Sequence, residues 1–121
     1  MAEVFKPERV VTKTLNTIKE LKSIVPKDLH TVLGNMEIYL ELLPSEVREC
    51  RIYELITDMM TLSALFHMFE RDVDVKSFPE TMVSKYVDLE IDLRNALKEI
   101  AMVAADYINE NCIKPEKRKL L

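Results

Sequence analysis

Residues 77–112 read SFPETMVSKYVDLEIDLRNALKEIAMVAADYINENC. Within this stretch, apolar side chains recur every three or four positions, at Met82, Tyr86, Leu89, Leu93, Leu97, Ile100, Ala104 and Tyr107. A period near 3.6 residues places these side chains along one face of an α-helix. The stretch therefore predicts an amphipathic helix, roughly 50 Å long at 1.5 Å per residue, with one face in a core.

The prolines divide the rest of the chain into further helices. Proline is tolerated in the first turn of a helix and disfavours helical geometry in the residue before it. Four of the five prolines stand just ahead of an apolar run at helical spacing. We expect helices from about Pro7 to Val25, from Pro26 to Leu43, from just after Pro44 to about Glu70, and from Ser77 or Phe78 to about Cys112.

These ranges predict an all-α fold, an antiparallel four-helix bundle in which two short helices precede a long helical hairpin. The 121 residues suit a single domain, with residues 114–121 as a short basic tail. The only glycine is Gly34, and chains with so few glycines tend to have few turns between long elements. Gly34 lies inside a helical pattern, which favours a close helix crossing there.

The two cysteines, Cys50 and Cys112, are too few and too far apart for a disulfide framework or a zinc site. We expect both to be free thiols, buried or half-buried. The first ten residues lack the apolar run of a secretory signal, and no stretch has the roughly 20 apolar residues of a membrane span. These features predict a protein of the reducing cytoplasm that has no membrane partner.

The third expected helix is apolar around most of its circumference between Leu55 and Phe69, so it needs cover on several sides. The two shorter helices reach only part of the way along the long hairpin, which would leave the hairpin tip uncovered. An apolar tip of this kind is typical of an interface with a second copy or a helical partner. The expected interface residues are Leu65, Phe66, Met68, Phe69, Phe78, Met82, Val83 and Tyr86.

Charge is unevenly distributed along the chain, whose formal net charge is −4. Residues 1–27 carry six basic and three acidic side chains, and residues 114–121 carry four and one. In an up-down-up-down bundle both ends of the chain lie at the same pole, where they could bind phosphate groups or an acidic partner. The residues concerned are Lys6, Arg9, Lys13, Lys114, Lys117, Arg118 and Lys119.

Carboxylates four residues apart share a helix face at Glu37 and Glu41, at Glu54 and Asp58, and at Asp88 and Asp92. Inward-facing carboxylates hold Mg²⁺ in all-α nucleotide pyrophosphohydrolases, which this chain resembles in helix count and acidic spacing. The pairs fall largely off the apolar stripes, so a solvated face is the preferred interpretation. His67 is expected to be a core histidine with a hydrogen-bond partner.

No nucleophilic triad, phosphate loop or metal motif appears in the sequence, so we expect no catalytic residue, no metal and no cofactor. The preferred hypothesis is a helical interaction or assembly module that self-associates and binds another macromolecule. One alternative is a nucleic-acid-contacting subunit of a nucleoprotein complex. The other alternative is a Mg²⁺-dependent all-α nucleotide pyrophosphohydrolase.

Overall fold

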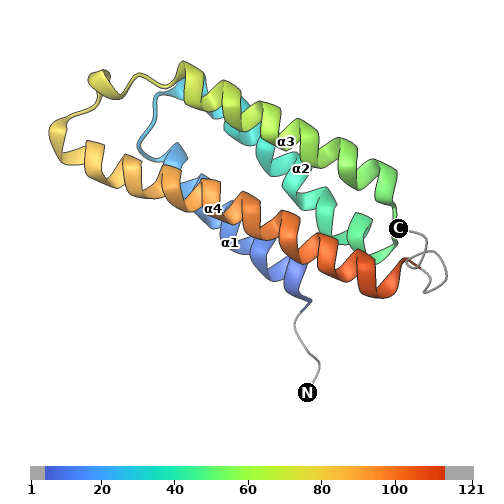
Figure 1. The fold of residues 1–121 in the computed structure, drawn as a ribbon. Coiled ribbons are helices and arrows are strands. Elements are labelled where there is room, and N and C mark those ends of the chain that lie inside the picture. Colours follow the sequence, from blue (N-terminus) through green and yellow to red (C-terminus); the bar gives the residue numbers. More distant parts are fainter. Residues whose placement is uncertain (1–4, 114–121) are drawn as a thin grey trace.

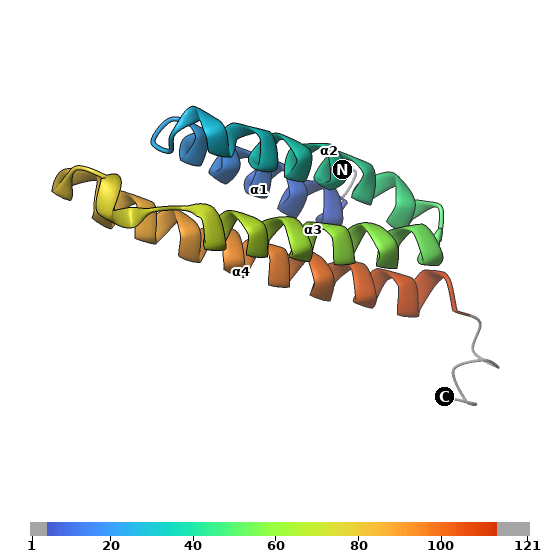
Figure 2. The same cartoon turned by 90° about the horizontal axis from the view of Figure 1, so that it is seen from above.

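The computed structural model describes residues 5–113, and these residues form four α-helices and two 3₁₀ turns without a strand. The helices are α1 (Lys6–Lys22), α2 (His30–Arg48), α3 (Ile52–Asp72) and α4 (Glu80–Asn111). The 3₁₀ turns η1 (Lys27–Leu29) and η2 (Val75–Ser77) precede α2 and α4. The predicted all-α bundle is thus confirmed, and successive helices run in opposite directions (Figures 1 and 2).

The core lies between two pairs of helices, α1 with α4 and α2 with α3 (Figure 1). Helices α1 and α2 also pack closely on each other. The predicted stripe of α4 faces this core, with Leu89, Leu93 and Ile100 all buried. Burying one such side chain stabilises the fold by about 1.5–3 kcal/mol, so these contacts hold the bundle together.

Pro44 does not begin the third helix, as we expected, but lies inside α2. The turn comes later, at Cys50, which has a positive φ of 57°. The N–H of Arg51 donates to the carbonyl of Glu46 (2.9 Å) and the N–H of Cys50 to that of Val47 (3.1 Å). These two bonds form the Schellman ending of a helix, in which glycine usually occupies the left-handed position. Because a cysteine occupies it here, the sequence showed no helix end at this point.

The shift of this turn makes α3 shorter than we predicted, so only α4 is a long helix. The connection between α3 and α4 still extends beyond the turn between α1 and α2 (Figure 2). The α3–α4 hairpin is therefore longer than the α1–α2 hairpin, as predicted, but the difference in length is smaller than the sequence suggested.

The expectation of two free thiols is wrong. Cys50 and Cys112 form a disulfide, with their Cα atoms 5.6 Å apart and a sequence separation of 62 residues. The bond ties the turn between α2 and α3 to the last turn of α4. Sequence spacing could not predict this pairing, because it depends on the bundle bringing the two helix ends together.

None of the helices within residues 5–113 combines the length and the apolar character needed to cross a bilayer. The predicted basic tail, residues 114–121, lies outside the residues that the structure describes.

Candidate functional site: an apolar groove between α3 and α4

Helices α3 and α4 approach each other less closely than the other neighbouring pairs. An open groove, the α3/α4 groove, runs between them as two adjoining hollows that share Met59, Ser63 and Ala101. The hollow nearer the disulfide has a volume of about 440 Å³, and the one nearer the α3–α4 connection about 580 Å³. We call these two parts the disulfide end and the loop end of the groove.

The disulfide end is lined by apolar side chains and one serine. Its lining residues are Ile52, Leu55, Ile56, Met59, Met60, Ser63, Ala101, Ala104, Ala105 and Ile108. The α3 wall carries the large side chains, whereas the α4 wall consists mostly of alanines. A surface of this composition has no polar group that water would solvate well, apart from the serine hydroxyl and exposed backbone.

Large apolar side chains are also exposed on α3 and α4, some in the lining of the groove and some outside it. Met60 on α3 is 68% exposed and Met102 on α4 is 67% exposed. Ile56 and Ile91 add exposed apolar surface on the same two helices. Single exposed apolar residues are ordinary, but a continuous apolar patch on a folded chain is typical of a binding surface.

The loop end of the groove carries a charged cluster that links α3 to α4. Nη2 of Arg94 donates to Glu70 (2.5 Å) on α3 and to Glu90 (2.6 Å) on its own helix. Hydrogen bonding with Glu90 and Arg94 lowers the pKa of Glu70, whereas burial raises the pKa of Glu90. Burial also raises the pKa of the neighbouring Tyr86 to about 12. The cluster therefore joins the helices at this end, as the disulfide does at the other.

The eight residues predicted to form an interface at the hairpin tip lie together, but most of them face the inside of the bundle. Phe66, Phe69 and Tyr86 are buried, and the rings of Phe69 and Tyr86 lie 6.3 Å apart. The half-buried members of the set are Leu65, Phe78, Met82 and Val83. Met68 is exposed, at 42%. Met60 in the groove lining, at 68%, is more exposed than any of these eight residues.

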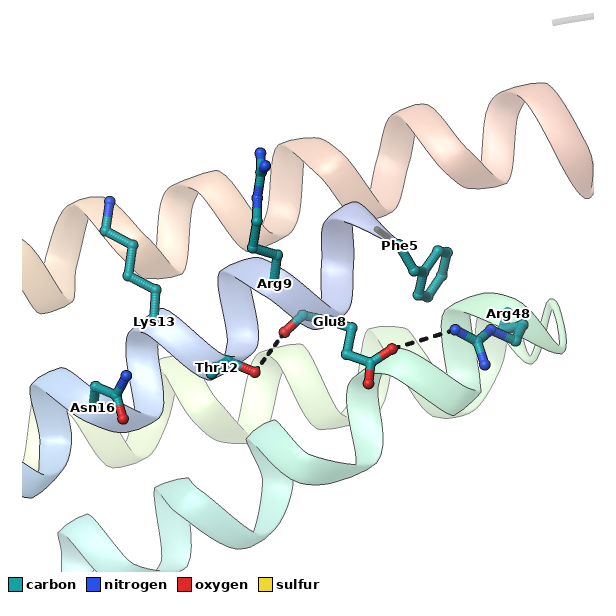
Figure 3. A pocket seen from close by; sticks show the side chains of 7 residues that line it. All are labelled: Phe5, Glu8, Arg9, Thr12, Lys13, Asn16 and Arg48. Atoms are coloured by element: carbon teal, nitrogen blue, oxygen red, sulfur yellow. Dashed lines mark hydrogen bonds and ion pairs between the residues drawn. The ribbon is translucent and has the colours of Figure 1, made fainter. Parts of the chain in front are cut away.

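The predicted basic pole is described only on its α1 side, because Lys114, Lys117, Arg118 and Lys119 lie outside the described residues. Figure 3 shows Arg9 and Lys13 projecting from α1, while Glu8 bonds to Arg48 at 3.4 Å. The guanidinium of Arg48 also lies 4.5 Å from the centre of the Phe5 ring.

A hollow between α1 and α4 brings Lys6 and Arg9 together with the carboxylates of Asp106 and Glu110 on α4. The surface around these basic residues is therefore mixed in charge. A contact with nucleic acid through Lys6, Arg9 and Lys13 stays a prediction.

His67 is not a core residue, as the sequence suggested, because its side chain is 76% exposed. Its Nδ1 lies 3.8 Å from Glu70, at the loop end of the groove. Among residues 5–113, no three histidine, cysteine or acidic side chains are grouped closely enough to hold a metal ion. The hydrolase hypothesis stays a prediction.

Our sequence reasoning did not single out the residues of the α4 wall. The signal was present, since Ala101 and Ala105 are small side chains beside Ala104 of the α4 stripe. On the α3 side, the apolar circumference between Leu55 and Phe69 did predict that this helix needs cover on several sides. The sequence did not show that α4 is the neighbouring helix that leaves part of the α3 surface uncovered.

We compared the chain with known proteins in three ways. No protein-family model matches it, and neither a curated protein nor a solved structure matches it significantly. The function must therefore be argued from the chain itself.

Proposed function

We propose that this chain is a helical interaction module that binds an apolar protein surface through the α3/α4 groove. The observation that supports the proposal is the disulfide end of the groove, whose ten lining residues include no charged side chain. Covering such a surface is favourable by about 25 cal/mol for each Å² of apolar area removed from water. The groove is open along its length, which suits an extended helical partner better than a small ligand.

The groove is also held in place before any partner binds. The disulfide fixes α4 at one end, and the ion pair of Arg94 with Glu70 links the helices at the other. A surface fixed in this way loses little conformational entropy when a partner docks. This arrangement favours recognition by a preformed surface over folding upon binding.

The disulfide also bears on where the module works. Such bonds persist mainly in oxidising compartments, and they are rare in the cytosol. The predicted cytoplasmic location stays a prediction, and the free thiols that supported it are replaced by a bond. An oxidising compartment is the better setting for the proposed module.

The proposal can be tested by crosslinking in the cells that naturally make the protein. A photo-reactive phenylalanine analogue replaces Met60 beside the groove in one variant and Ile38 on α2 in a control variant. Ile38 is 58% exposed, so both probes face solvent in the free protein. We expect a defined adduct only from position 60, and its loss when Met102→Asp is added. Equal crosslinking from positions 60 and 38 would contradict the proposal.

A further inference from the structure

The proposed function leaves open what occupies the groove, and the width of the apolar surface bears on this question. Apolar side chains line the disulfide end of the groove, Met60 among them, and Met102, which follows Ala101 of the lining, adds a side chain that is 67% exposed. A single helix seated in the groove would cover the lining residues but leave Met102, which lines neither hollow, in water. Covering both requires a surface two helices wide, and this chain presents such a surface itself.

The side chains on the two walls of the groove differ in size, and this difference suits the pairing of two copies of the chain. The α3 wall carries Ile56, Met59 and Met60, whereas the facing α4 wall carries Ala101 and Ala105. In a two-fold interface, if one residue contacts another, the reciprocal contact also forms. An arrangement that places α3 of one copy on α4 of the other fits large side chains over small ones twice.

The charges at the loop end fit the same arrangement. Glu70 lies on α3 and Lys98 on α4, and both line the loop end of the groove. When α3 of one copy lies on α4 of the other, Glu70 comes near Lys98 of the second copy, and the reverse contact also forms.

We infer that the α3/α4 groove binds a second copy of this chain, with α3 of each copy packed antiparallel on α4 of the other and the two-fold axis parallel to the groove. This inference rests on the proposed function and specifies its partner. The groove follows α3 from Ile52 to Glu70, about 27 Å at 1.5 Å per residue. Two helices about 10 Å wide over this length give a footprint of roughly 540 Å² in projection. Two such footprints together amount to about 1,080 Å², which exceeds the ~1,000 Å² of total area that a biological interface needs.

Sedimentation equilibrium on the full, disulfide-bonded chain at micromolar concentrations tests the inference. The wild type is expected to be a dimer, and Met60→Asp is expected to raise the dimer dissociation constant at least about 100-fold, since each interface carries the change twice. Ile38→Asp places the same charge on the exposed face of α2 and is expected to leave the dimer intact. Circular dichroism checks that each variant keeps its helical content.

The pairing of α3 with α4 has its own test. Ala105→Leu enlarges the small wall and is expected to weaken the dimer about tenfold or more, because the large side chains of the other copy then clash with it. Adding Met60→Ala in the same chain removes bulk from the facing wall and is expected to restore most of the affinity. If Ala105→Leu leaves the dimer unchanged, or if Met60→Ala fails to restore it, this pairing is wrong.

A wild-type monomer throughout the micromolar range would overturn the inference, as would a dimer that Ile38→Asp disrupts and Met60→Asp does not. These results are distinguishable from failure of the proposed function. A monomer that still gives a crosslink from position 60, with an adduct mass other than twice that of the chain, would keep the interaction module and assign it a different partner. Equal crosslinking from positions 60 and 38 would contradict both the proposed interaction module and the inferred dimer.

Discussion

The bundle has two kinds of helix contact, and α4 takes part in both. Its face toward α1 is closed, and Leu93 there is fully buried. Its face toward α3 is the open groove, and Met102, which follows Ala101 of the groove lining, is 67% exposed. The closed contacts supply the stability of the fold, whereas the open contact is held mainly at its two ends. An apolar surface that the fold does not need for its own stability is available for binding.

Removing the disulfide is the largest expected perturbation, because the bond holds one end of the open contact. It closes a loop with a sequence separation of 62 residues, for which chain entropy gives a contribution of about 4 kcal/mol. We expect Cys50→Ser with Cys112→Ser to lower the free energy of unfolding by about this amount, measured by urea denaturation. Amide exchange should quicken most in the last turns of α4. An unchanged stability would show that packing alone holds α4 against α3.

Shortening one side chain on each face of α4 compares the two contacts directly. Leu93→Ala leaves a cavity in the closed face and is expected to cost about 3–4 kcal/mol of unfolding free energy. Met102→Ala on the open face is expected to cost less than about 0.5 kcal/mol, because the side chain is already in water. Thermal denaturation at a concentration that keeps the chain monomeric measures both. Similar losses would mean that the groove is covered within the single chain.

A buried carboxyl is a polar defect in the closed contact between α2 and α3. Glu46 on α2 is 4% exposed, and its Oε1 has no hydrogen-bond partner within the described residues. Burial raises the pKa of Glu46 to about 7, and the carboxyl of Asp58 on α3 adds to the shift. Glu54 acts in the same direction and Arg51 in the opposite one, but neither outweighs burial.

Because the pKa is higher in the folded chain than in the unfolded one, the unfolded state releases this proton first as pH rises. Stability should therefore fall between about pH 4.5 and 7, by about 3 kcal/mol at most. We expect Glu46→Gln to remove this decline, so that the variant is more stable than the wild type at pH 8. Glu41→Gln, an exposed change on the same helix, is the control. Parallel pH profiles for the wild type and Glu46→Gln would show that Glu46 is solvated.

The sequence predicted the closed contacts better than the open one, for a physical reason. The periodic stripe of α4 is local, so Leu89, Leu93 and Ile100 could be assigned to a core from their spacing alone. The helix end at Cys50 was missed because its signal lies in backbone hydrogen bonds and not in a glycine. Pro44 was misread because proline is tolerated at the first turn of a helix and so suggested a helix start, whereas here it lies inside α2.

The α3/α4 groove depends on how α3 and α4 lie relative to each other, and no local sequence pattern indicates this. The apolar circumference of the third helix and the alanines of the fourth were both visible in the sequence. Whether two apolar surfaces bury each other depends on how closely the helices approach, and this distance is set by all four helices together. The same holds for the disulfide, since Cys50 and Cys112 meet only when the bundle has formed. Sequence reasoning therefore recognised the need for cover but placed the uncovered surface at the hairpin tip.

The smallest expected effect concerns the closed contact between α1 and α2. A Cβ added at Gly34 would lie 3.8 Å from Nζ of Lys22, an ordinary contact with the end of a flexible side chain. The close crossing that we expected at this glycine is therefore not required. Gly34→Ala should raise the free energy of unfolding by about 0.5–1 kcal/mol, because alanine loses less backbone entropy in a helix. Chemical denaturation measures the change in the free energy of unfolding. A loss of stability would show that α1 and α2 leave no room for a methyl group. Even this closed contact would then depend on the absence of a side chain at residue 34.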